Sequence, residues 1–188
     1  MEIKLNEHHE YEVDGIKRPA VTNILKAVGF IDTTWYTMDG ATRGKYVHLA
    51  CHLDDIGELD EAELDPVLMP YLEAYRLFKN EQGYQVIESE VYHYNPTYGY
   101  CGTPDKDGLL NGKPTIIDLK TGKFQDWTAL QLALYALFYP EPRDRLGVEL
   151  KDNGTYILHP FKDRKDYNTA LSAVHCYMWQ INHGRKEL

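Results

Sequence analysis

The sequence predicts an α/β domain in which helices flank a mixed central sheet. Helix patterns fill residues 19–82, and from residue 84 the apolar residues switch to the alternation that is typical of strands. The chain has 188 residues, of which 43% are hydrophobic and 26% are charged, which suits one folded core. We therefore expect a single domain over residues 1–188, with a helical N-terminal part at 19–82 and a core at 84–188.

The N-terminal part is expected to start with a short extended segment and to continue as helices. The segment 1–18 contains a turn signal at Asp14-Gly15. A glycine follows each of the next three helix patterns, at the position where helices commonly end. The expected helices cover residues 19–28, 39–56 and 66–82.

The core is expected to combine antiparallel strands with buried helices. Residues 84–94 alternate and are rich in Tyr, Val and Ile, which predicts a strand. A short connection then returns the chain as a second, antiparallel strand, and Asn111-Gly112 is a typical hairpin turn that folds a third strand back on the second. The expected strands cover residues 84–94, 98–105, 113–120 and 154–159, and the expected helices cover 127–139 and 166–184.

The net charge of −9 is concentrated in one segment of the chain. Residues 49–82 hold nine acidic and two basic residues, so this segment carries −7 and the rest of the chain only −2. Because the acidity is local, it does not exclude a nucleic-acid partner on another face.

Composition also argues against a membrane protein and against a metal–cysteine protein. The longest apolar stretch, 129–139, has 11 residues, whereas a spanning helix needs about 20. The N-terminus lacks the cationic start and apolar middle of a signal peptide. The three cysteines (Cys51, Cys101 and Cys176) are far apart, so we expect free thiols, no disulfide framework and no iron–sulfur cluster.

The residues that carry chemistry lie around the expected hairpin. The segment Gly102-Thr-Pro-Asp105 precedes the turn, and Asp118-Leu-Lys120 ends the strand after it. Side chains alternate along a strand, so Asp118 and Lys120 share one face while Leu119 points into the core. The hairpin can bring Asp105 beside Asp118. Two adjacent carboxylates repel unless one is protonated or a cation joins them, and a hard divalent cation prefers such oxygen ligands.

These motifs, taken in order, resemble the PD-(D/E)XK nuclease superfamily. Pro104-Asp105 followed by Asp118-Leu119-Lys120 matches the core of that superfamily. Further matches point to its RecB-type branch, which includes the mitochondrial genome maintenance exonuclease and stand-alone phage exonucleases. These matches are Arg43-Gly44 with His48, a Glu before the first Asp (Glu88 or Glu90), Gln131 with Tyr135, and the opening segment 18–22.

The resemblance implies a restriction-endonuclease-like core and a metal-dependent DNA exonuclease that acts on single strands or DNA ends. It implies Mg²⁺ or Mn²⁺, one or two ions, held by His48, Asp105, Asp118 and the Leu119 carbonyl, and His48 favours Mn²⁺ somewhat. Lys120 would assist the attack of water on the phosphodiester. The resemblance also assigns Gln131 and Tyr135 to the active site, where we infer that they hold a DNA phosphate or the edge of the site.

Several of these assignments have a plainer alternative in the sequence. His52 lies one turn after His48, so spacing alone allows either histidine as the ligand. Gln131 and Tyr135 also fit a buried helix stripe. Glu90, which we expect on a strand face with Tyr92 and Tyr94, is a further metal ligand, a support for the ligands or a solvated carboxylate. The tyrosines near this turn can stack on single-stranded bases or simply pair across the strands.

Two other functions remain open from the sequence. One is a structure-specific or restriction-type endonuclease, and the other is a catalytically silent relative that binds nucleic acid. The expected partners are DNA and recombination or replication proteins. We expect no association with a membrane, and a location in the cytoplasm of a bacterial or phage-infected cell. The sequence gives no indication of the oligomeric state.

Overall fold

The computed structural model describes residues 1–6, 10–31 and 38–185. In chain order the helices are α1 (Val21–Ala27), α2 (Met38–Ile56), α3 (Met69–Gln82), α4 (Thr128–Ala136) and α5 (Lys165–Asn182). The strands are β1 (Ile3–Leu5), β2 (Tyr11–Val13), β3 (Ile16–Arg18), β4 (Tyr84–Ser89), β5 (His93–Asn95), β6 (Tyr100–Gly102), β7 (Lys106–Leu110), β8 (Lys113–Lys120), β9 (Asp144–Leu150) and β10 (Tyr156–Pro160).

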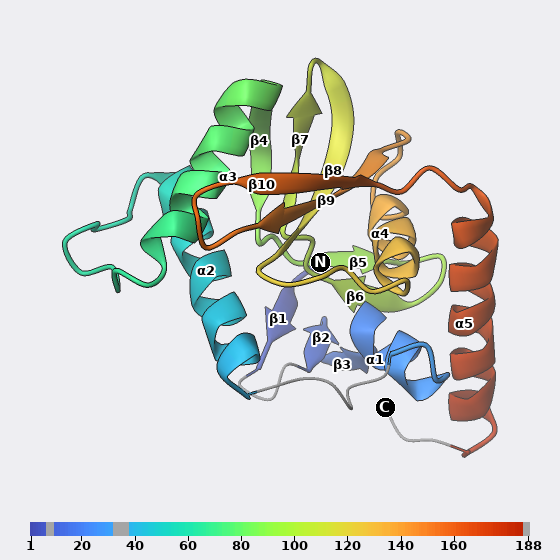
Figure 1. The fold of residues 1–188 in the computed structure, drawn as a ribbon. Coiled ribbons are helices and arrows are strands. Elements are labelled where there is room, and N and C mark those ends of the chain that lie inside the picture. Colours follow the sequence, from blue (N-terminus) through green and yellow to red (C-terminus); the bar gives the residue numbers. More distant parts are fainter. Residues whose placement is uncertain (7–9, 32–37, 186–188) are drawn as a thin grey trace.

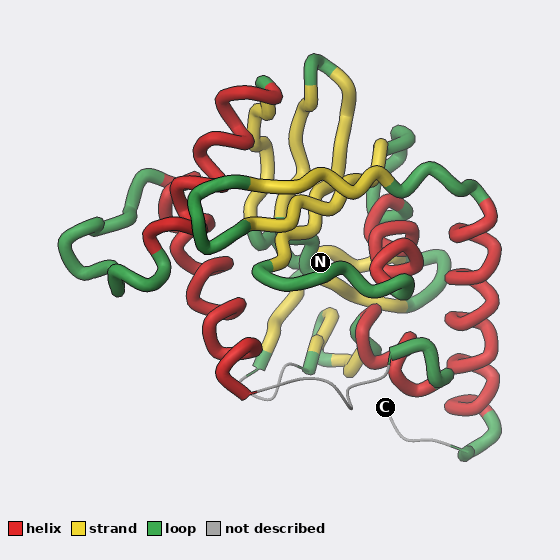
Figure 2. The backbone as a smooth tube through the Cα atoms, in the orientation of Figure 1, coloured by secondary structure: helices red, strands yellow, loops and turns green. Residues whose placement is uncertain are grey.

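A five-stranded mixed sheet forms the centre of the molecule, in the order β10-β9-β8-β7-β4. The β8–β9 pair is parallel and the other pairs are antiparallel. Two smaller sheets, β1-β2-β3 and β5-β6, lie beside it. Helices α2 and α3 lie on one side of the central sheet and α4 and α5 on the other (Figures 1 and 2). The predicted α/β class with a mixed sheet between helices is confirmed.

Alternation along β8 places apolar side chains in both layers. Ile117 and Leu119 pack with the apolar residues of α2 and α3, and Ile116 packs with those of α1, α4 and α5. Asp118 is two residues from Ile116 and therefore shares its face. The predicted strand 113–120, with its apolar centre and its polar Asp118 and Lys120, is confirmed.

Two predicted strands near residue 90 are wrong in their bounds. The range 84–94 splits into β4 and β5, because Glu90 adopts a left-handed backbone with a φ of 55° and ends the strand. Tyr92 and Tyr94 therefore do not share a strand face with Glu90. The range 98–105 contains only β6, which pairs with β5, and the hairpin partner of β8 is β7.

Strand β9 was not predicted, because its sequence does not look like a buried strand. Arg145 and Glu149 interrupt its apolar residues and Gly147 lies at its centre. In the structure Arg145 pairs with Asp166, and the glycine makes room for the ring of Phe124, which a Cβ at Gly147 would meet at 2.5 Å. Tertiary contacts thus decide this element.

The N-terminal expectations agree with the structure apart from their exact ends. Asp14 and Gly15, with φ values of 49° and 79°, form the turn between β2 and β3. Helices α1, α2 and α3 correspond to the three expected helices. Gly83 ends α3 in a left-handed conformation, as expected from the sequence. Among the described residues, no helix is long and apolar enough to cross a membrane.

Gly108 gives a direct test of the β4–β7 pairing. A Cβ at Gly108 would collide with the backbone oxygen of Gln85 on β4. We expect Gly108→Ala to lower the free energy of unfolding by about 2 kcal/mol or more, as overpacking does. Gly44→Ala in α2 is the control, because its Cβ would meet only Thr121 Oγ1, at 3.8 Å. Urea unfolding of both variants checks this, and equal stability would contradict the described pairing.

Candidate active site

Two buried carboxyl groups form the base of the candidate site. Asp105 precedes β7 and Asp118 lies in β8, and because Lys106 pairs with Ile117 the two aspartates are neighbours. The Leu119 N–H donates to Asp105 Oδ2 at 2.6 Å. The predicted approach of Asp105 to Asp118 is therefore present in the structure.

The pKa values of the two carboxyl groups are shifted in opposite directions. Burial, together with the charge of Asp105, raises the pKa of Asp118 to about 6, although Lys120 opposes this rise. Burial also acts to raise the pKa of Asp105, but His48, Lys120 and the Leu119 N–H outweigh it and lower that pKa to about 2. A pair of adjacent buried carboxylates holds both negative charges at neutral pH only with positive charge nearby.

His48 of α2 supplies part of this positive charge. Its Nε2–H donates to the Leu119 carbonyl at 2.9 Å, and its Nδ1 lies 3.5 Å from Asp105 Oδ1 and 3.6 Å from Glu90 Oε1. Burial acts to lower the pKa of His48, but the two carboxylates outweigh it and raise the pKa to about 10. The Leu119 carbonyl, expected as a metal ligand, thus faces the His48 ring in this arrangement.

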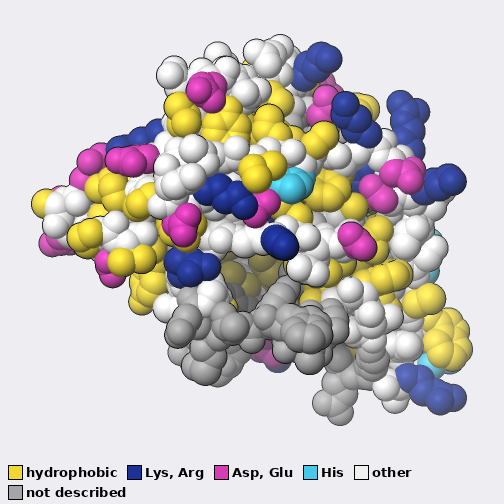
Figure 3. All heavy atoms as spheres, in the orientation of Figure 1, with side chains coloured by type: hydrophobic (Ala, Val, Ile, Leu, Met, Phe, Trp, Pro, Cys, Tyr) yellow, Lys and Arg dark blue, Asp and Glu magenta, His cyan; other side chains and the backbone are white. Residues whose placement is uncertain are grey.

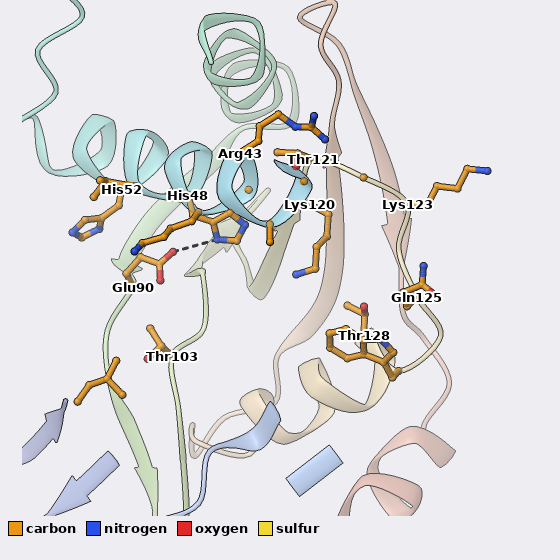
Figure 4. Close-up of a pocket in the computed structure, with 18 of the residues that line it drawn as sticks. Arg43, His48, His52, Glu90, Thr103, Lys120, Thr121, Lys123, Gln125 and Thr128 are labelled. Atoms are coloured by element: carbon orange, nitrogen blue, oxygen red, sulfur yellow. Dashed lines mark ion pairs between the residues drawn. The ribbon is translucent and has the colours of Figure 1, made fainter. Parts of the chain in front are cut away.

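Glu90 completes the cluster through its unusual backbone. Its N–H donates to the Asp105 carbonyl at 3.1 Å, and its carboxylate turns toward His48 (Figure 4). Within the described part of the chain, the buried Glu90 Oε1 has no hydrogen-bond partner. One ligand atom from each of His48, Glu90 and Asp105 lies within 4.8 Å of the other two. The Glu90 side chain is 29% exposed, so its position is compatible with each of the three roles left open for it: a metal ligand, a support for the ligands or a solvated carboxylate.

His52, the alternative by spacing, lies outside this cluster. Its Nδ1 lies 2.8 Å from Ser89 Oγ. The structure therefore brings His48, and not His52, next to the carboxylates of Glu90 and Asp105.

Lys120 lies at the end of β8 with Asp118. Its Nζ is 2.6 Å from Asp118 Oδ2, and its side chain is partly exposed. Figure 4 shows Lys120 pointing into the space that His48 and Glu90 also face. The ammonium is therefore within reach of both the carboxylates and a molecule in the cavity.

Gln131 and Tyr135 share one face of α4, as their spacing predicts, and like Asp105 and Asp118 they are not among the residues that line the cavity. Both are buried, and Gln131 Nε2 donates to Tyr135 OH at 3.1 Å. Burial raises the pKa of Tyr135 well above its ordinary value, so the phenol stays neutral. Its ring packs on Gly102, where a Cβ would approach it to 2.6 Å.

A cavity of about 940 Å³ opens above the cluster, between α2 and the loop that joins β8 to α4. Figure 3 shows Lys and Arg side chains around the hollow on this face, while acidic side chains gather on the projection beyond α2. Four basic residues line the cavity: Arg43, Lys45, Lys120 and Lys123. Three aromatic residues line it as well: Tyr11, Tyr92 and Trp127. The sequence motifs include Arg43 and Lys120; Lys45 lies between Arg43 and His48 on α2, and Lys123 lies in the loop after β8.

The donor set fits a divalent cation. An imidazole nitrogen and two carboxylate oxygens converge there, with a third carboxylate, Asp118, next to them. Carboxylate oxygens suit Mg²⁺ and Mn²⁺, and imidazole suits first-row transition metals. Glu90 Oε1 accepts no hydrogen bond, although His48 Nδ1 lies 3.6 Å away, and the two aspartates repel each other. A cation at this place would relieve both.

Comparison with known proteins identifies the fold. No protein-family profile matches the sequence, and no curated protein matches it. An alkaline exonuclease from Laribacter hongkongensis aligns over 89% of both chains, with a TM-score of 0.52 and 13% identity. A putative exonuclease from Eubacterium rectale aligns over 91% of this chain and 77% of its own, with a TM-score of 0.53 and 14% identity. The chain has the fold of these two exonuclease structures, which agrees with the predicted nuclease-like fold.

Proposed function

We propose that this protein is a divalent-metal-dependent deoxyribonuclease that degrades DNA from its ends. The convergence of His48, Glu90 and Asp105 within 4.8 Å, beside the Asp118–Lys120 pair, is the observation that carries the proposal. The fold shared with exonucleases supports the reaction class. The basic rim of the cavity supports a polyanionic substrate, since phosphates dominate the affinity of proteins for DNA.

In this proposal, some residues of the site bind the cation and another binds the phosphodiester. His48, Glu90, Asp105 and Asp118 would hold the metal. When bound, a divalent cation supplies an activated water at neutral pH and neutralises charge on the phosphate. Lys120 would bind the scissile phosphate and stabilise the negative charge that develops on it.

The walls around these groups would fix the strand. Arg43, Lys45 and Lys123 would bind neighbouring phosphates along the rim of the cavity. Gln131 and Tyr135 would support the site through the packing of Tyr135 against Gly102. We expect the enzyme to serve recombination, repair or replication, where DNA ends are processed.

We propose single-stranded DNA or single-stranded ends as the substrate, because aromatic side chains share the cavity with the basic ones. Tyr92 is 43% exposed, and its ring meets that of Tyr11 edge-on, with 6.0 Å between the two ring centroids. Tyr11 is in turn fixed by a hydrogen bond to Thr103 at 2.6 Å. Unpaired bases stack on such exposed rings, whereas bases within a duplex are already stacked on each other.

Replacement of Tyr92 tests the preference for single strands. We expect Tyr92→Ala to raise the KM for single-stranded DNA about fivefold or more, since one stacked base contributes about 1–3 kcal/mol. The value of kcat should stay nearly unchanged. Tyr46→Ala is the matched control, because Tyr46 is 51% exposed on α2 and does not line the cavity. Equal KM values for both variants would contradict a stacking role of Tyr92.

Circular DNA distinguishes the exonuclease from the endonuclease. In Mn²⁺, we expect the protein to degrade a linear strand and to leave a covalently closed circle of the same sequence intact. If the circle is cut at a rate similar to that of the linear strand, the protein is an endonuclease with the same metal-dependent chemistry, and the exonuclease proposal is wrong. DNA binding without cleavage of either substrate would favour the silent relative.

A further inference from the structure

A fully buried lysine directly follows one of the proposed metal ligands in the chain. Lys106, the residue after Asp105, has 0% of its surface exposed. Its Nζ lies 3.0 Å from Asp55 Oδ2 and donates to Ser89 Oγ at 2.7 Å. Burial of an ammonium is unfavourable unless a partner charge and hydrogen bonds compensate for the lost water. This lysine therefore depends on specific partners from other elements.

Asp55, the partner charge, is itself fixed from a third element. Its carboxylate accepts hydrogen bonds from Tyr75 OH at 2.9 Å and from Lys79 Nζ at 2.8 Å, both on α3. Its side chain is only 2% exposed. The Asp55–Lys106 pair thus has little freedom to move, because its surroundings hold the carboxylate in place.

The pair connects three of the four segments that carry the proposed metal ligands; the fourth, β8 with Asp118, pairs with β7 in the sheet. Asp55 lies seven residues after His48 on α2, which is about two helical turns and so the same helix face. Ser89 pairs with Lys106 in the sheet and directly precedes Glu90. Lys106 directly follows Asp105. One buried ammonium therefore fixes the backbone next to Glu90 and Asp105, and the helix of His48, relative to each other.

We propose that Lys106 is a positioning residue that sets the spacing of His48, Glu90 and Asp105 for a divalent cation. The proposal rests on the proposed function of this site. Its contribution is geometric: without the tie, the three segments keep their fold but no longer hold their ligand atoms within the distance that one cation needs. Loss of groups that support metal ligands typically costs about 10–100-fold in metal affinity or activity.

The test compares two charge-balanced double variants that remove a buried ion pair from the same strand. Lys106→Met with Asp55→Asn removes the tie, and Lys79, which loses Asp55 as a partner, keeps its ion pair with Asp54 at 2.9 Å. Arg143→Met with Asp107→Asn is the control, because Arg143 Nε pairs with Asp107 Oδ1 at 2.9 Å and Asp107 lies on β7, directly after Lys106. Ser89→Ala keeps the ion pair and removes the link of Lys106 to β4, together with the contact of Ser89 Oγ with His52 Nδ1, and serves as a variant with little risk to folding.

The primary readout is the affinity for Mn²⁺ in the absence of DNA. It is measured from the electron paramagnetic resonance signal of the free ion. We expect Lys106→Met/Asp55→Asn to bind Mn²⁺ at least about tenfold more weakly, Ser89→Ala to bind it measurably more weakly, and the control to bind as the wild type does. At saturating Mn²⁺, the KM for DNA should stay within twofold of the wild-type value, which a general loss of structure would not allow.

The outcomes separate this proposal from the one it rests on. Wild-type Mn²⁺ affinity in the folded double variant would overturn the positioning role and leave the proposed function standing. If the double variant does not fold, unchanged Mn²⁺ affinity in Ser89→Ala overturns the role instead. Absence of Mn²⁺ binding by the wild type would overturn both proposals together.

Discussion

Replacement of Asp118 by Asn is expected to abolish nuclease activity without destabilising the protein. The variant removes a carboxylate that we place at the metal, and a metal that polarises a phosphodiester contributes several kcal/mol, so we expect a loss of about 10³-fold or more in kcat/KM. The amide has nearly the shape of the carboxyl group. Activity measured on single-stranded DNA in Mn²⁺ checks this expectation.

The stability of the same variant has a predicted sign. Because burial raises the pKa of Asp118 to about 6, above its ordinary value, its protonated form favours the folded state. This contribution is fully present below the ordinary pKa and is lost as the pH rises through about 6. At pH 8 in EDTA the ionised Asp118 therefore opposes folding, and the neutral Asn does not. We expect Asp118→Asn to melt at the wild-type temperature or above it.

Added metal should reverse the order of the two melting temperatures, so that the wild type melts above Asp118→Asn. At 100-fold excess over its Kd, a ligand that binds only the folded state stabilises it by about 2.7 kcal/mol. Mn²⁺ should therefore raise the melting temperature of the wild type and have a much smaller effect on Asp118→Asn. An equal Mn²⁺-dependent rise in both proteins, or a variant that melts far below the wild type in EDTA, would contradict the assignment of Asp118.

Replacement of Lys120 by Met is expected to separate catalysis from metal binding. The ammonium lies against Asp118 and points into the cavity, so we place it on the scissile phosphate and not among the metal ligands. We expect kcat to fall by about 10²–10³-fold, the usual effect of losing one group that stabilises charge in the transition state. The affinity for Mn²⁺ should stay near that of the wild type.

Lys123→Met is the matched control for Lys120→Met. Both lysines line the cavity, but Figure 4 shows Lys123 on the rim, pointing outward. Its loss should raise the KM for DNA, more at low salt than at high salt, and leave kcat nearly intact. Similar losses of kcat in both variants would argue that Lys120 acts only as a general phosphate contact.

The turn and the second strand of the hairpin that carries the site could be predicted, because their signals are local. Asn111 and Gly112 have the positive φ values, 49° and 77°, that their residue types favour, so the turn fixes the register of β7 and β8. Register and alternation then place Asp105 beside Asp118 and Lys120 on the same face as Asp118. The spacing on α4 similarly placed Gln131 one turn before Tyr135.

The parts that could not be predicted depend on contacts between distant segments. Strand β7 begins with Lys106-Asp107-Gly108, a sequence that is typical of a loop. In the structure Asp55 pairs with Lys106 and Arg143 pairs with Asp107, so both charged side chains can lie in a buried strand. The position of Glu90 depends on a left-handed backbone that its residue type does not favour. No periodic pattern in a single sequence carries such information.

The choice between His48 and His52 shows the same limit. The two residues are one turn apart, and only the docking of α2 on the sheet decides which ring meets the Leu119 carbonyl and the Asp105 carboxylate. The cavity likewise forms from elements far apart in the chain, so its combination of basic and aromatic residues appears only in the folded protein.

The most direct test of a metal-dependent nuclease at this site is the fate of an end-labelled linear single strand. We predict that the wild-type protein shortens this DNA to a ladder of smaller products in Mn²⁺ or Mg²⁺, and that EDTA stops the reaction. Full-length DNA that persists in both metals, with a protein that is folded and has bound Mn²⁺, would contradict the proposed function.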